Sequence, residues 1–518
     1  MGWTLHPSVE IRRERHFGDR EVLCFAERPG SVYEAFAAAC DADPKAEALV
    51  CGEERLSYGE LAERAGRVSA GLAERGVRAG DRVGMLLGNR VEFATTLLGV
   101  LRLGAIAVPI GTRLQKPEIE YILEQCGAVA LVHESSLASR VPSLERLWNE
   151  TQVEQGRGPL PPVRAAREED TAIILYTSGT TGRPKGAMLT HFNIVHSLLH
   201  FQHCLRLVAG ERAMLAVPAS HVTGVVAILL TSWQARGCTI VMPEFKARDF
   251  LELAARERIS YTILVPAMYT LCLMQPDFER CDLSSWRVGG YGGAPMPEAT
   301  IAALTKKLPS LGLHNAYGAT ETTSPSTIMA AERTGGHPDS VGWTVPCGEI
   351  LIVAPDGKEV PRGEAGELWI RGPMVVPGYW DNPEATRQAF TDGYWRSGDV
   401  GSMDEAGFVR VFDRLKDLVN RGGHKVYSVE VENVLSHHPA VLESAIVGKP
   451  CPVLGERVHA FVTLKAPASE DELRRFCGER LADYKVPESF TLLDAPLPRN
   501  ANGKLLKRAL RDTLAQRA

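Results

Sequence analysis

The chain has 518 residues, of which 45% are hydrophobic and 23% are charged, a composition typical of globular proteins. At roughly 150 residues per domain, this length corresponds to three or four domains or subdomains. The formal net charge of −5 provides no strong basic field, so we expect neither a nucleic-acid partner nor attraction to an anionic membrane.

The eleven cysteines are scattered along the chain, and no Cys-x-x-Cys pair occurs. An odd number without metal-ligand spacing favours neither a disulfide framework nor a zinc site. A reducing compartment suits such a chain. The amino terminus also lacks the basic and apolar stretches of a secretory signal. We therefore expect a cytoplasmic protein.

The first 55 residues show no clear pattern, but from Tyr58 helical and strand patterns alternate. Apolar spacing predicts helices near 61–72, 91–103 and 117–125, and strands at 82–87, 105–110 and 128–132. The apolar stretch 93–110 contains Arg102 and a proline, so it predicts a helix and a strand instead of a membrane span. This alternation indicates βαβ units in a parallel sheet, with ligands at the carboxyl ends of the strands.

A connector at 152–170, rich in proline and charge, precedes a second alternating series with strands predicted at 172–175, 214–217, 239–242 and 262–265. Beyond about residue 335, two apolar runs at 349–353 and 367–370 flank the turn dipeptide Asp356-Gly357, which predicts antiparallel pairing. We place a domain boundary at Lys416. The remaining residues show mixed α and β patterns, including a helix near 470–481.

One stretch, 176–186, has the sequence Tyr-Thr-Ser-Gly-Thr-Thr-Gly-Arg-Pro-Lys-Gly and follows the predicted strand 172–175. Its glycines allow close approach of backbone N–H groups to a ligand, and its hydroxyls and Lys185 favour a phosphate. The spacing differs from the Walker loop, because Lys185 is followed by Gly186. An ordinary Ser/Gly-rich surface loop is the alternative, and the preceding apolar strand disfavours it.

This stretch resembles the phosphate loop of the adenylate-forming superfamily: acyl- and aryl-CoA synthetases, adenylation domains of peptide synthetases, and beetle luciferases. Five further segments between 218 and 504 are similar to its motifs in the same order, so the resemblance, closest to acyl- or aryl-CoA synthetases, covers nearly the whole chain. It implies an α/β fold. Residues 1–415 would form a large AMP-binding domain of doubly wound βαβ subdomains with a small β-barrel-like subdomain. Residues 416–518 would form a small mobile α+β domain carrying a catalytic lysine.

The resemblance implies a set of residues that bind ATP or AMP: Thr177, Ser178, Gly179, Thr180, Thr181, Gly182, Lys185, Gly293, Ala294, Pro295, Asn315, Tyr317, Gly318, Thr320, Asp399, Arg414 and Lys504. In the motif Tyr-Gly-x-Thr-Glu at 317–321, the aromatic ring would stack on adenine and the Thr320 hydroxyl would bind the α-phosphate. Glu321 would hold Mg²⁺, which prefers one or two carboxylates plus phosphate oxygens.

Two further nucleotide contacts are implied outside that motif. Asp399, in Ser-Gly-Asp, would accept hydrogen bonds from the ribose hydroxyls, with Arg414 as its partner near ribose and phosphate. Lys504, in the Pro-x-x-x-x-Gly-Lys segment 498–504, would contact the substrate carboxylate and the α-phosphate. The catalytic candidates are Lys504, Glu321, Thr320 and His221.

The segment 218–224 is similar to Pro-x-x-His-x-x-Gly, which places His221 at the mouth of the carboxylate pocket. The pocket implied by the resemblance is lined by His221, Gly224, Val225, Gly292, Gly293 and Thr322. Taken alone, His221 is better explained as a loop histidine with satisfied hydrogen bonds than as a pocket residue. The Asp that amino-acid-activating relatives carry here is missing, which favours a fatty, aryl or bulky acid without an α-amino group. Ser220 stands where the superfamily often has a bulky aromatic residue, and the smaller serine side chain would widen the pocket.

Lys416 matches the hinge of the superfamily, and Gly422 and Gly423 match the loop that lines its pantetheine tunnel. The next residues, His-Lys-Val-Tyr-Ser at 424–428, differ from the commoner Glu-Asn-x-Tyr-Pro, and this leaves the thiol partner open.

The predicted function is that of an ATP-dependent acyl-CoA synthetase, which forms an acyl-adenylate and pyrophosphate and then a thioester with CoA. One alternative is a ligase that loads a separate carrier protein. A second is a non-catalytic nucleotide-binding regulator, disfavoured because the expected catalytic positions are intact. A luciferase-type oxygenase has no supporting feature. The oligomeric state stays open, with a homodimer among the alternatives.

Overall fold

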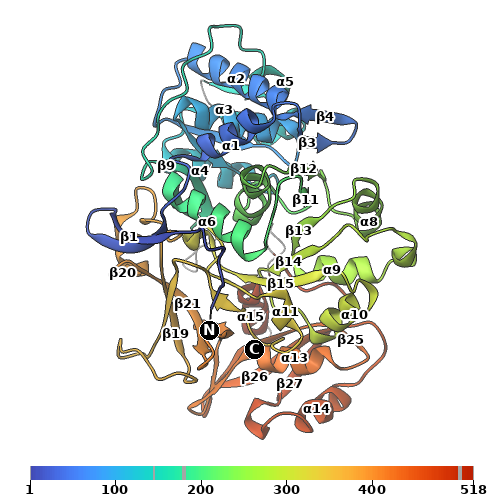
Figure 1. The fold of residues 1–518 in the computed structure, drawn as a ribbon. Helices are drawn as coiled ribbons and strands as arrows, with labels where there is room; N and C mark the ends of the chain where they lie inside the picture. The colour runs from blue at the N-terminus through green and yellow to red at the C-terminus, as the bar shows by residue number, and fades with distance from the viewer. Residues whose placement is uncertain (1, 144–145, 178–182, 500–504, 517–518) are drawn as a thin grey trace. The chain divides into compact units, whose positions relative to one another are not determined.

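The computed structural model describes residues 2–143, 146–177, 183–499 and 505–516 (Figure 1). Contacts divide the chain into a larger unit, formed by Met1–Met296, Ile301–Ile350 and Ile370–Arg396, and a smaller unit, formed by Pro297–Thr300, Leu351–Trp369 and Ser397–Ala518. Within the described ranges, no helix is both long and apolar enough to cross a membrane.

The first sheet of the larger unit has six strands in the order β10-β9-β6-β5-β7-β8. Their bounds are β5 (Arg82–Leu86), β6 (Ile106–Pro109), β7 (Ala130–His133), β8 (Leu147–Asn149), β9 (Thr171–Thr177) and β10 (Lys185–Thr190). All neighbours pair in parallel except β10, which is antiparallel to β9. Helix α4 (Lys116–Cys126) packs Ile119, Ile122 and Leu123 against this sheet. The predicted βαβ arrangement is confirmed.

The second sheet has nine strands in the order β17-β16-β15-β14-β13-β11-β12-β3-β4. Their bounds are β3 (Glu47–Cys51), β4 (Glu54–Ser57), β11 (Arg212–Leu215), β12 (Cys238–Val241), β13 (Tyr261–Leu264), β14 (Val288–Gly292), β15 (Gly312–Tyr317), β16 (Thr327–Ile328) and β17 (Trp343–Thr344). The six strands from β15 to β3 are parallel. The carboxyl ends of neighbouring strands therefore meet at one edge, where ligands bind in such sheets.

The larger unit also contains the helices that precede, connect or follow these strands along the chain. They are α1 (Val32–Ala42), α2 (Tyr58–Glu74), α3 (Val91–Leu103), α5 (Glu150–Val153), α6 (His191–Cys204), α7 (Thr231–Gln234), α8 (Ala247–Arg256), α9 (Pro266–Leu273), α10 (Glu298–Lys307), α11 (Ala331–Thr334) and α12 (Pro383–Ala389), the π-helix η2 (Thr223–Leu230), and the 3₁₀ helices η1 (Ser135–Arg140), η3 (Phe278–Arg280) and η4 (Thr320–Thr322). Helix α3 contacts β3, β5 and β6, and so touches both sheets.

Helix α6 begins with a capping box, in which the Thr190 hydroxyl accepts from the Asn193 amide. Every residue from 191 to 201 is buried, so α6 is a core helix without a solvent-facing side. A hairpin that the sequence pattern did not reveal, β1 (Ile11–His16) and β2 (Arg20–Phe25), packs Val22 and Cys24 against Phe192 of α6.

A five-stranded sheet has the order β18-β19-β21-β20, with β22 beside β21. It lies in the part of the chain where the β-barrel-like subdomain is expected. Its strands are β18 (Glu349–Val353), β19 (Gly366–Arg371), β20 (Phe390–Thr391), β21 (Tyr394–Met403) and β22 (Val409–Arg414). The chain passes from one unit to the other within β18, β19 and β21.

The rest of the smaller unit is an α+β arrangement. Its sheet contains β23 (Val419–Arg421), β24 (His424–Val426), β25 (Val441–Cys451), β26 (Gly455–Leu464) and β27 (Ser489–Leu493), and its helices are α13 (Ser428–Ser436), α14 (Glu470–Gly478), α15 (Lys507–Gln516) and the 3₁₀ helix η5 (Asp483–Lys485). Alternate side chains of β25 point to opposite faces of this sheet and so belong to two separate hydrophobic cores. Ile446 packs with α13 and α14, whereas Ala445 and Val447 pack with α15.

Candidate active site

The predicted phosphate loop connects two paired strands of the first sheet. Strand β9 ends at Thr177 and β10 begins at Lys185, and these two residues are directly opposite in the antiparallel register. The Thr177 hydroxyl donates to the Lys185 carbonyl over 3.5 Å. The five predicted phosphate ligands between them, Ser178, Gly179, Thr180, Thr181 and Gly182, lie outside the described residues. Strand pairing thus fixes both ends of the predicted loop.

The glycine turn and the Tyr-Gly-x-Thr-Glu motif follow neighbouring parallel strands. In the register of β14 and β15, Gly292 lies opposite Ala316. A Cβ at Gly292 would stand 2.3 Å from the Ala316 carbonyl oxygen, so only glycine fits. Gly293 has φ +77°, a conformation that glycine adopts without strain. The turn 292–295 and Tyr317-Gly318 therefore extend from the same sheet edge. Asn315 donates to the Ser340 carbonyl over 3.2 Å.

Glu321 lies in η4, directly after Thr320, and is only 8% exposed. Its Oε1 accepts a 2.8 Å hydrogen bond from the Tyr379 hydroxyl, and its carbonyl accepts from the Val376 amide over 3.0 Å. The Lys185 ammonium lies 5.2 Å from the centroid of the Tyr379 ring. Burial first, and then the charge of Glu321, raises the pKa of Tyr379, so this hydroxyl stays a donor.

This group joins three elements. Strand β10, which carries Lys185, contacts η4, which carries Glu321, and Tyr379 bridges the two side chains. A fixed carboxylate beside a lysine suits a site for Mg²⁺ and phosphate. The sequence reasoning missed Tyr379. The available signal was its place in Pro-Gly-Tyr-Trp at 377–380, a turn and aromatic segment with no assigned partner.

The predicted acyl-pocket residues begin at the loop before η2. The Val225 amide donates to the His221 carbonyl over 2.9 Å, and the His221 amide donates to the Pro218 carbonyl over 3.1 Å. A Cβ at Gly224 would stand 2.2 Å from the Pro218 oxygen. π-Helical backbone such as η2 is rare and is found frequently at functional sites. Close backbone packing thus explains the glycine of this motif.

Asn89 holds that loop and was also missed by the sequence reasoning. Its side-chain amide donates to the carbonyls of Val217 and Met242, each over 3.0 Å, and its oxygen accepts from the Ala219 amide over 2.7 Å. Asn89 is buried, so three satisfied hydrogen bonds fix the segment that precedes His221. A lone Asn between β5 and α3 gives no signal for this role in the sequence.

The smaller unit carries the remaining predicted residues. Asp399 of β21 and Arg414 of β22 are opposite in the register, and Arg414 Nε lies 2.6 Å from Asp399 Oδ1. Asp399 is 3% exposed. Lys416 follows in an exposed turn. Gly422 (φ +59°) and Gly423 (φ +89°) form the turn between β23 and β24. Lys504 lies outside the described residues.

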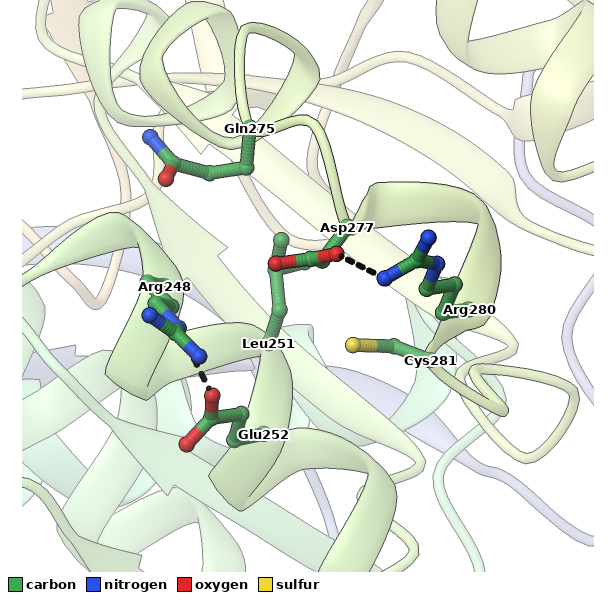
Figure 2. A pocket seen from close by; sticks show the side chains of 7 residues that line it. All are labelled: Arg248, Leu251, Glu252, Gln275, Asp277, Arg280 and Cys281. Atoms are coloured by element: carbon green, nitrogen blue, oxygen red, sulfur yellow. Dashed lines mark hydrogen bonds and ion pairs between the residues drawn. The ribbon is translucent and has the colours of Figure 1, made fainter.

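Two other features of the larger unit contain none of the predicted site residues. Figure 2 shows a pocket of about 300 Å³ lined by Arg248, Leu251, Glu252, Gln275, Asp277, Arg280 and Cys281. Its charges are already paired, because Arg248 contacts Glu252 and Arg280 contacts Asp277, each over 2.9 Å. We assign it no ligand.

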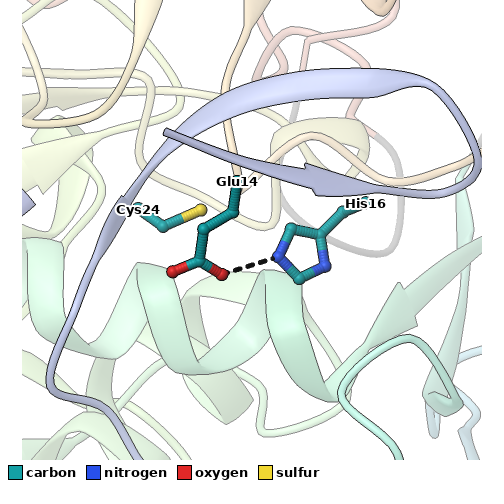
Figure 3. Close-up of side chains that lie close together, drawn as sticks. All are labelled: Glu14, His16 and Cys24. Atoms are coloured by element: carbon teal, nitrogen blue, oxygen red, sulfur yellow. Dashed lines mark hydrogen bonds and ion pairs between the residues drawn. The ribbon is translucent and has the colours of Figure 1, made fainter. Parts of the chain in front are cut away.

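Figure 3 shows the second feature, in which Glu14, His16 and Cys24 of the hairpin gather their ligand atoms within 4.8 Å. Arg28 occupies this cluster, since its guanidinium lies 2.7 Å from Glu14 Oε2. The hydrogen bond from Arg28 is the largest cause of the lowered pKa of Glu14. A cation already balances this carboxylate, so the cluster fits an ion-pair network better than a metal site.

Comparison with known proteins agrees with this geometry. The model of the AMP-binding enzyme family matches residues 36–380, and that of the AMP-binding enzyme C-terminal domain matches residues 430–504. The chain therefore belongs to the family of AMP-binding enzymes.

Particular relatives are CoA synthases and ligases. The chain is 36% identical over 474 residues to a feruloyl-CoA synthase of an Amycolatopsis species, covering 90% of this chain and 96% of the relative. It is 32% identical over 473 residues to the long-chain-fatty-acid–CoA ligase FadD13 of Mycobacterium tuberculosis, covering 88% and 93%. The structure of o-succinylbenzoate CoA synthetase from Bacillus subtilis, in complex with its acyl-adenylate, has a TM-score of 0.86 at 31% identity and covers 92% of this chain and 98% of that one.

Proposed function

We propose that this protein is an ATP-dependent acid–thiol ligase that joins a carboxylic acid to CoA through an acyl-adenylate. The observation that carries the proposal is the group formed by Lys185, Glu321 and Tyr379 beside the glycine turn. It combines a cation, a fixed carboxylate and close-packed backbone at the carboxyl edge of a parallel sheet. Relatives that use a carboxylic acid and CoA support the same class of reaction.

In the first step, a carboxylate oxygen attacks the α-phosphorus of ATP, and the bond to pyrophosphate breaks. Both reactants are anions, so the site must neutralise charge and align them. We assign this work to Lys185 and the 177–185 loop at the phosphates, Thr320 at the α-phosphate, and Lys504 between carboxylate and phosphate. Mg²⁺ held by Glu321 would supply further neutralisation of the phosphate oxygens. His221 would face the carboxylate.

The adenosine contacts proposed from the larger unit are Tyr317 and Gly318 together with the turn Gly293-Ala294-Pro295 and Asn315. We assign Asp399 and Arg414 to the ribose. Their close ion pair supports this role, since a buried carboxylate held by an arginine is preorganised to accept hydrogen bonds from hydroxyls.

In the second step, a thiolate attacks the acyl carbon and AMP leaves. We propose that the domain of residues 416–518 turns about Lys416 between the two steps, and that Gly422 and Gly423 line the path of the pantetheine arm. Such rotation exchanges catalytic groups and protects the mixed anhydride from water. We place the reaction in the cytoplasm, where CoA is the thiol available.

A carrier protein is the second candidate for the thiol. The exposed Lys425, two residues after Gly423, would suit an acidic carrier surface at the place where the thiol partner would enter, as it would suit the phosphates of CoA. The His424 ring stacks on Tyr484 with centroids 4.6 Å apart. Thioester formation with CoA alone, detected by mass spectrometry, would exclude the need for a carrier.

The decisive test is pyrophosphate release over a panel of carboxylic acids, with hydroxylamine trapping of the adenylate. Lys504→Ala should slow adenylate formation by about 10²–10³ and affect thioester formation from supplied adenylate much less. Lys465→Ala, at an exposed lysine of the same unit, is the matched control and should leave both half-reactions unchanged. Equal losses in the two half-reactions would contradict the assignment of Lys504.

A further inference from the structure

Helix α6 and the segment after η4 carry buried polar groups without hydrogen-bond partners. Ser197 and His200 of α6, and Thr323 and Ser326 after η4, are each 0% exposed. The three hydroxyl oxygens make no hydrogen bond with the described part of the chain, whereas the His200 ring has the backbone of Pro346 as a hydrogen-bond partner on one side. An unsatisfied buried group costs about 1–3 kcal/mol, and folded proteins contain few of them. Three such hydroxyls on two segments, next to a buried imidazole, therefore suggest that a partner comes from outside the chain.

Two backbone segments bring α6 to this region, one at each end. At the first end, the Asn193 side chain donates to the Val375 carbonyl over 3.1 Å. The next residue, Val376, donates its amide to the carbonyl of Glu321 over 3.0 Å. The start of α6 is thus joined through one extended segment to the residue that precedes Thr322.

At the second end, the Val345 amide donates to the Ser326 carbonyl over 3.0 Å. The backbone of the next residue, Pro346, lies beside the His200 ring and opposes the shift by which burial lowers the pKa of His200. His200 follows Asn193 by seven positions, two helical turns on the same side of α6. The segment from Glu321 to Ser326 is therefore bracketed by two segments that both contact one side of α6.

This region adjoins the acyl pocket predicted from the sequence. Thr322, a predicted pocket residue, directly precedes Thr323. Helix η2, which begins two residues after His221, packs against α6. The two segments that carry the unpaired hydroxyls therefore neighbour predicted pocket residues, one along the chain and one through the packing of α6 on η2.

We propose that Ser197, His200, Thr323 and Ser326, here called the polar strip, bind a neutral hydrogen-bonding group at the end of the acid that is remote from its carboxylate. This inference rests on the proposed function and specifies its substrate. The strip contains hydroxyls and one imidazole but no carboxylate, ammonium or guanidinium. Burial keeps His200 neutral, so one ring nitrogen donates and the other accepts. Hydroxyl, methoxy and carbonyl groups satisfy such a set.

The substrate class follows from which polar groups of the strip each kind of acid would leave without a hydrogen bond. A plain alkyl chain would leave the three hydroxyls of the strip without partners, and a second carboxylate would bring an unbalanced charge into the interior. The strip therefore favours an oxygenated aromatic or alicyclic acid over an unsubstituted fatty acid. A site built to hydrogen-bond a substrate hydroxyl rejects the analogue without it by up to about 10⁴–10⁵.

The test compares acids that differ only by an oxygen substituent at the far end. Suitable pairs are cinnamic acid with 4-hydroxycinnamic acid, and decanoic acid with 10-hydroxydecanoic acid. We expect kcat/KM for pyrophosphate release to be at least about 100-fold higher for the oxygenated member of the preferred pair. Equal values in every pair, or preference for the unsubstituted acids, would overturn the inference while leaving the ligase activity established.

A binding measurement covers the case in which no acid is turned over. Non-hydrolysable acyl-sulfamoyl adenosines of the same pairs can be titrated calorimetrically with the full chain. Tighter binding of the oxygenated member supports the polar strip even if catalysis fails under the chosen conditions. Equal affinities would overturn it, and absence of binding by all these analogues would contradict both the proposed function and this inference.

Substitutions locate the effect in the strip. Ser197→Ala and Ser326→Ala should each lower the ratio of kcat/KM between the paired acids by about tenfold, because each removes one hydrogen bond. Ser69→Ala is the matched control. Ser69 is also 0% exposed and also lacks a partner among the described residues, but it lies on α2. A change of the ratio in Ser69→Ala, or none in the strip variants, would show that the unpaired groups have only a structural origin.

Discussion

The hydroxyl of Tyr379 donates a 2.8 Å hydrogen bond to the Glu321 carboxylate, while the ring of the same tyrosine lies 5.2 Å from the Lys185 ammonium. One side chain thus fixes both the proposed metal ligand and the lysine of the proposed phosphate loop. We expect Tyr379→Phe to lower kcat/KM for adenylate formation by about tenfold, through loss of one charge-assisted hydrogen bond. The Mg²⁺ concentration for half-maximal rate should rise as well, which a purely structural role would not cause.

Tyr58→Phe is the control for this variant. The Tyr58 hydroxyl is also buried and donates over 2.7 Å, but to the Gly237 carbonyl. Its loss should change stability without changing the Mg²⁺ dependence. If both variants shift the Mg²⁺ dependence equally, Tyr379 does not act through Glu321.

The ion pair of Asp399 with Arg414 should determine affinity for the nucleotide. We expect Asp399→Asn to raise KM for ATP at least tenfold, because the amide has lost the charge that orients Arg414 and accepts less strongly from ribose hydroxyls. The comparison variant is Asp404→Asn, which weakens the 3.1 Å pair of Asp404 with Arg410 in the same unit. Steady-state kinetics at varied ATP should distinguish the two variants, with KM for ATP raised only in Asp399→Asn. An unchanged KM in Asp399→Asn would contradict the ribose assignment.

The buried histidines of α6 should make stability depend on pH. Burial lowers the pKa of His191 to about 4 and that of His196 to about 3, against an ordinary value of 6.5. The unfolded chain therefore binds protons first as the pH falls. Stability is fully present above about pH 6.5 and decreases below it, by up to about 1.4 kcal/mol per pH unit for each such histidine, until the folded pKa is reached.

Urea unfolding between pH 7 and 4 measures this slope. His196→Gln should make the slope shallower by about one proton. The unmodified chain, unfolded under the same conditions, is the reference for this slope. A slope unaffected by His196→Gln would mean that this histidine is protonated equally in the folded and unfolded states.

Arg28 should anchor the amino-terminal hairpin. Its side chain is only 7% exposed and pairs with Glu14 over 2.7 Å and with Glu168 over 2.6 Å. Removing one partner of a buried pair leaves uncompensated charge, so Arg28→Ala should lower the free energy of unfolding by about 3–5 kcal/mol. Arg12→Ala is the control, because Arg12 also contacts Glu14 but is 57% exposed. Its loss should have a much smaller effect, because exposed ion pairs contribute little to stability, and comparable losses in the two variants would refute the anchoring role.

The periodic elements were predictable because their patterns are local. Helix α3 spans 91–103 as predicted, and α2, α4, β5, β6 and β9 lie within a few residues of their predicted bounds. The helix predicted near 470–481 ends at Gly478. The hairpin β1–β2 showed no sequence pattern, because its strands carry charged residues whose partners lie outside the hairpin, such as Arg28 for Glu14 and Glu169 for His16.

The sequence alone determined the family, the order of the elements and the set of motif residues, since glycines, hydroxyls and charges at fixed spacings define local chemistry. It could not reveal Tyr379 beside Glu321, Asn89 behind the His221 loop, or the polar strip of α6 and the segment after η4. Each of these joins residues separated by 58 or more positions. Such contacts depend on how the sheets and helices pack. The tertiary structure decides them, because packing buries polar groups that are distant in sequence beside one another, and a buried polar group is stable only when it is hydrogen-bonded to the chain or to a ligand.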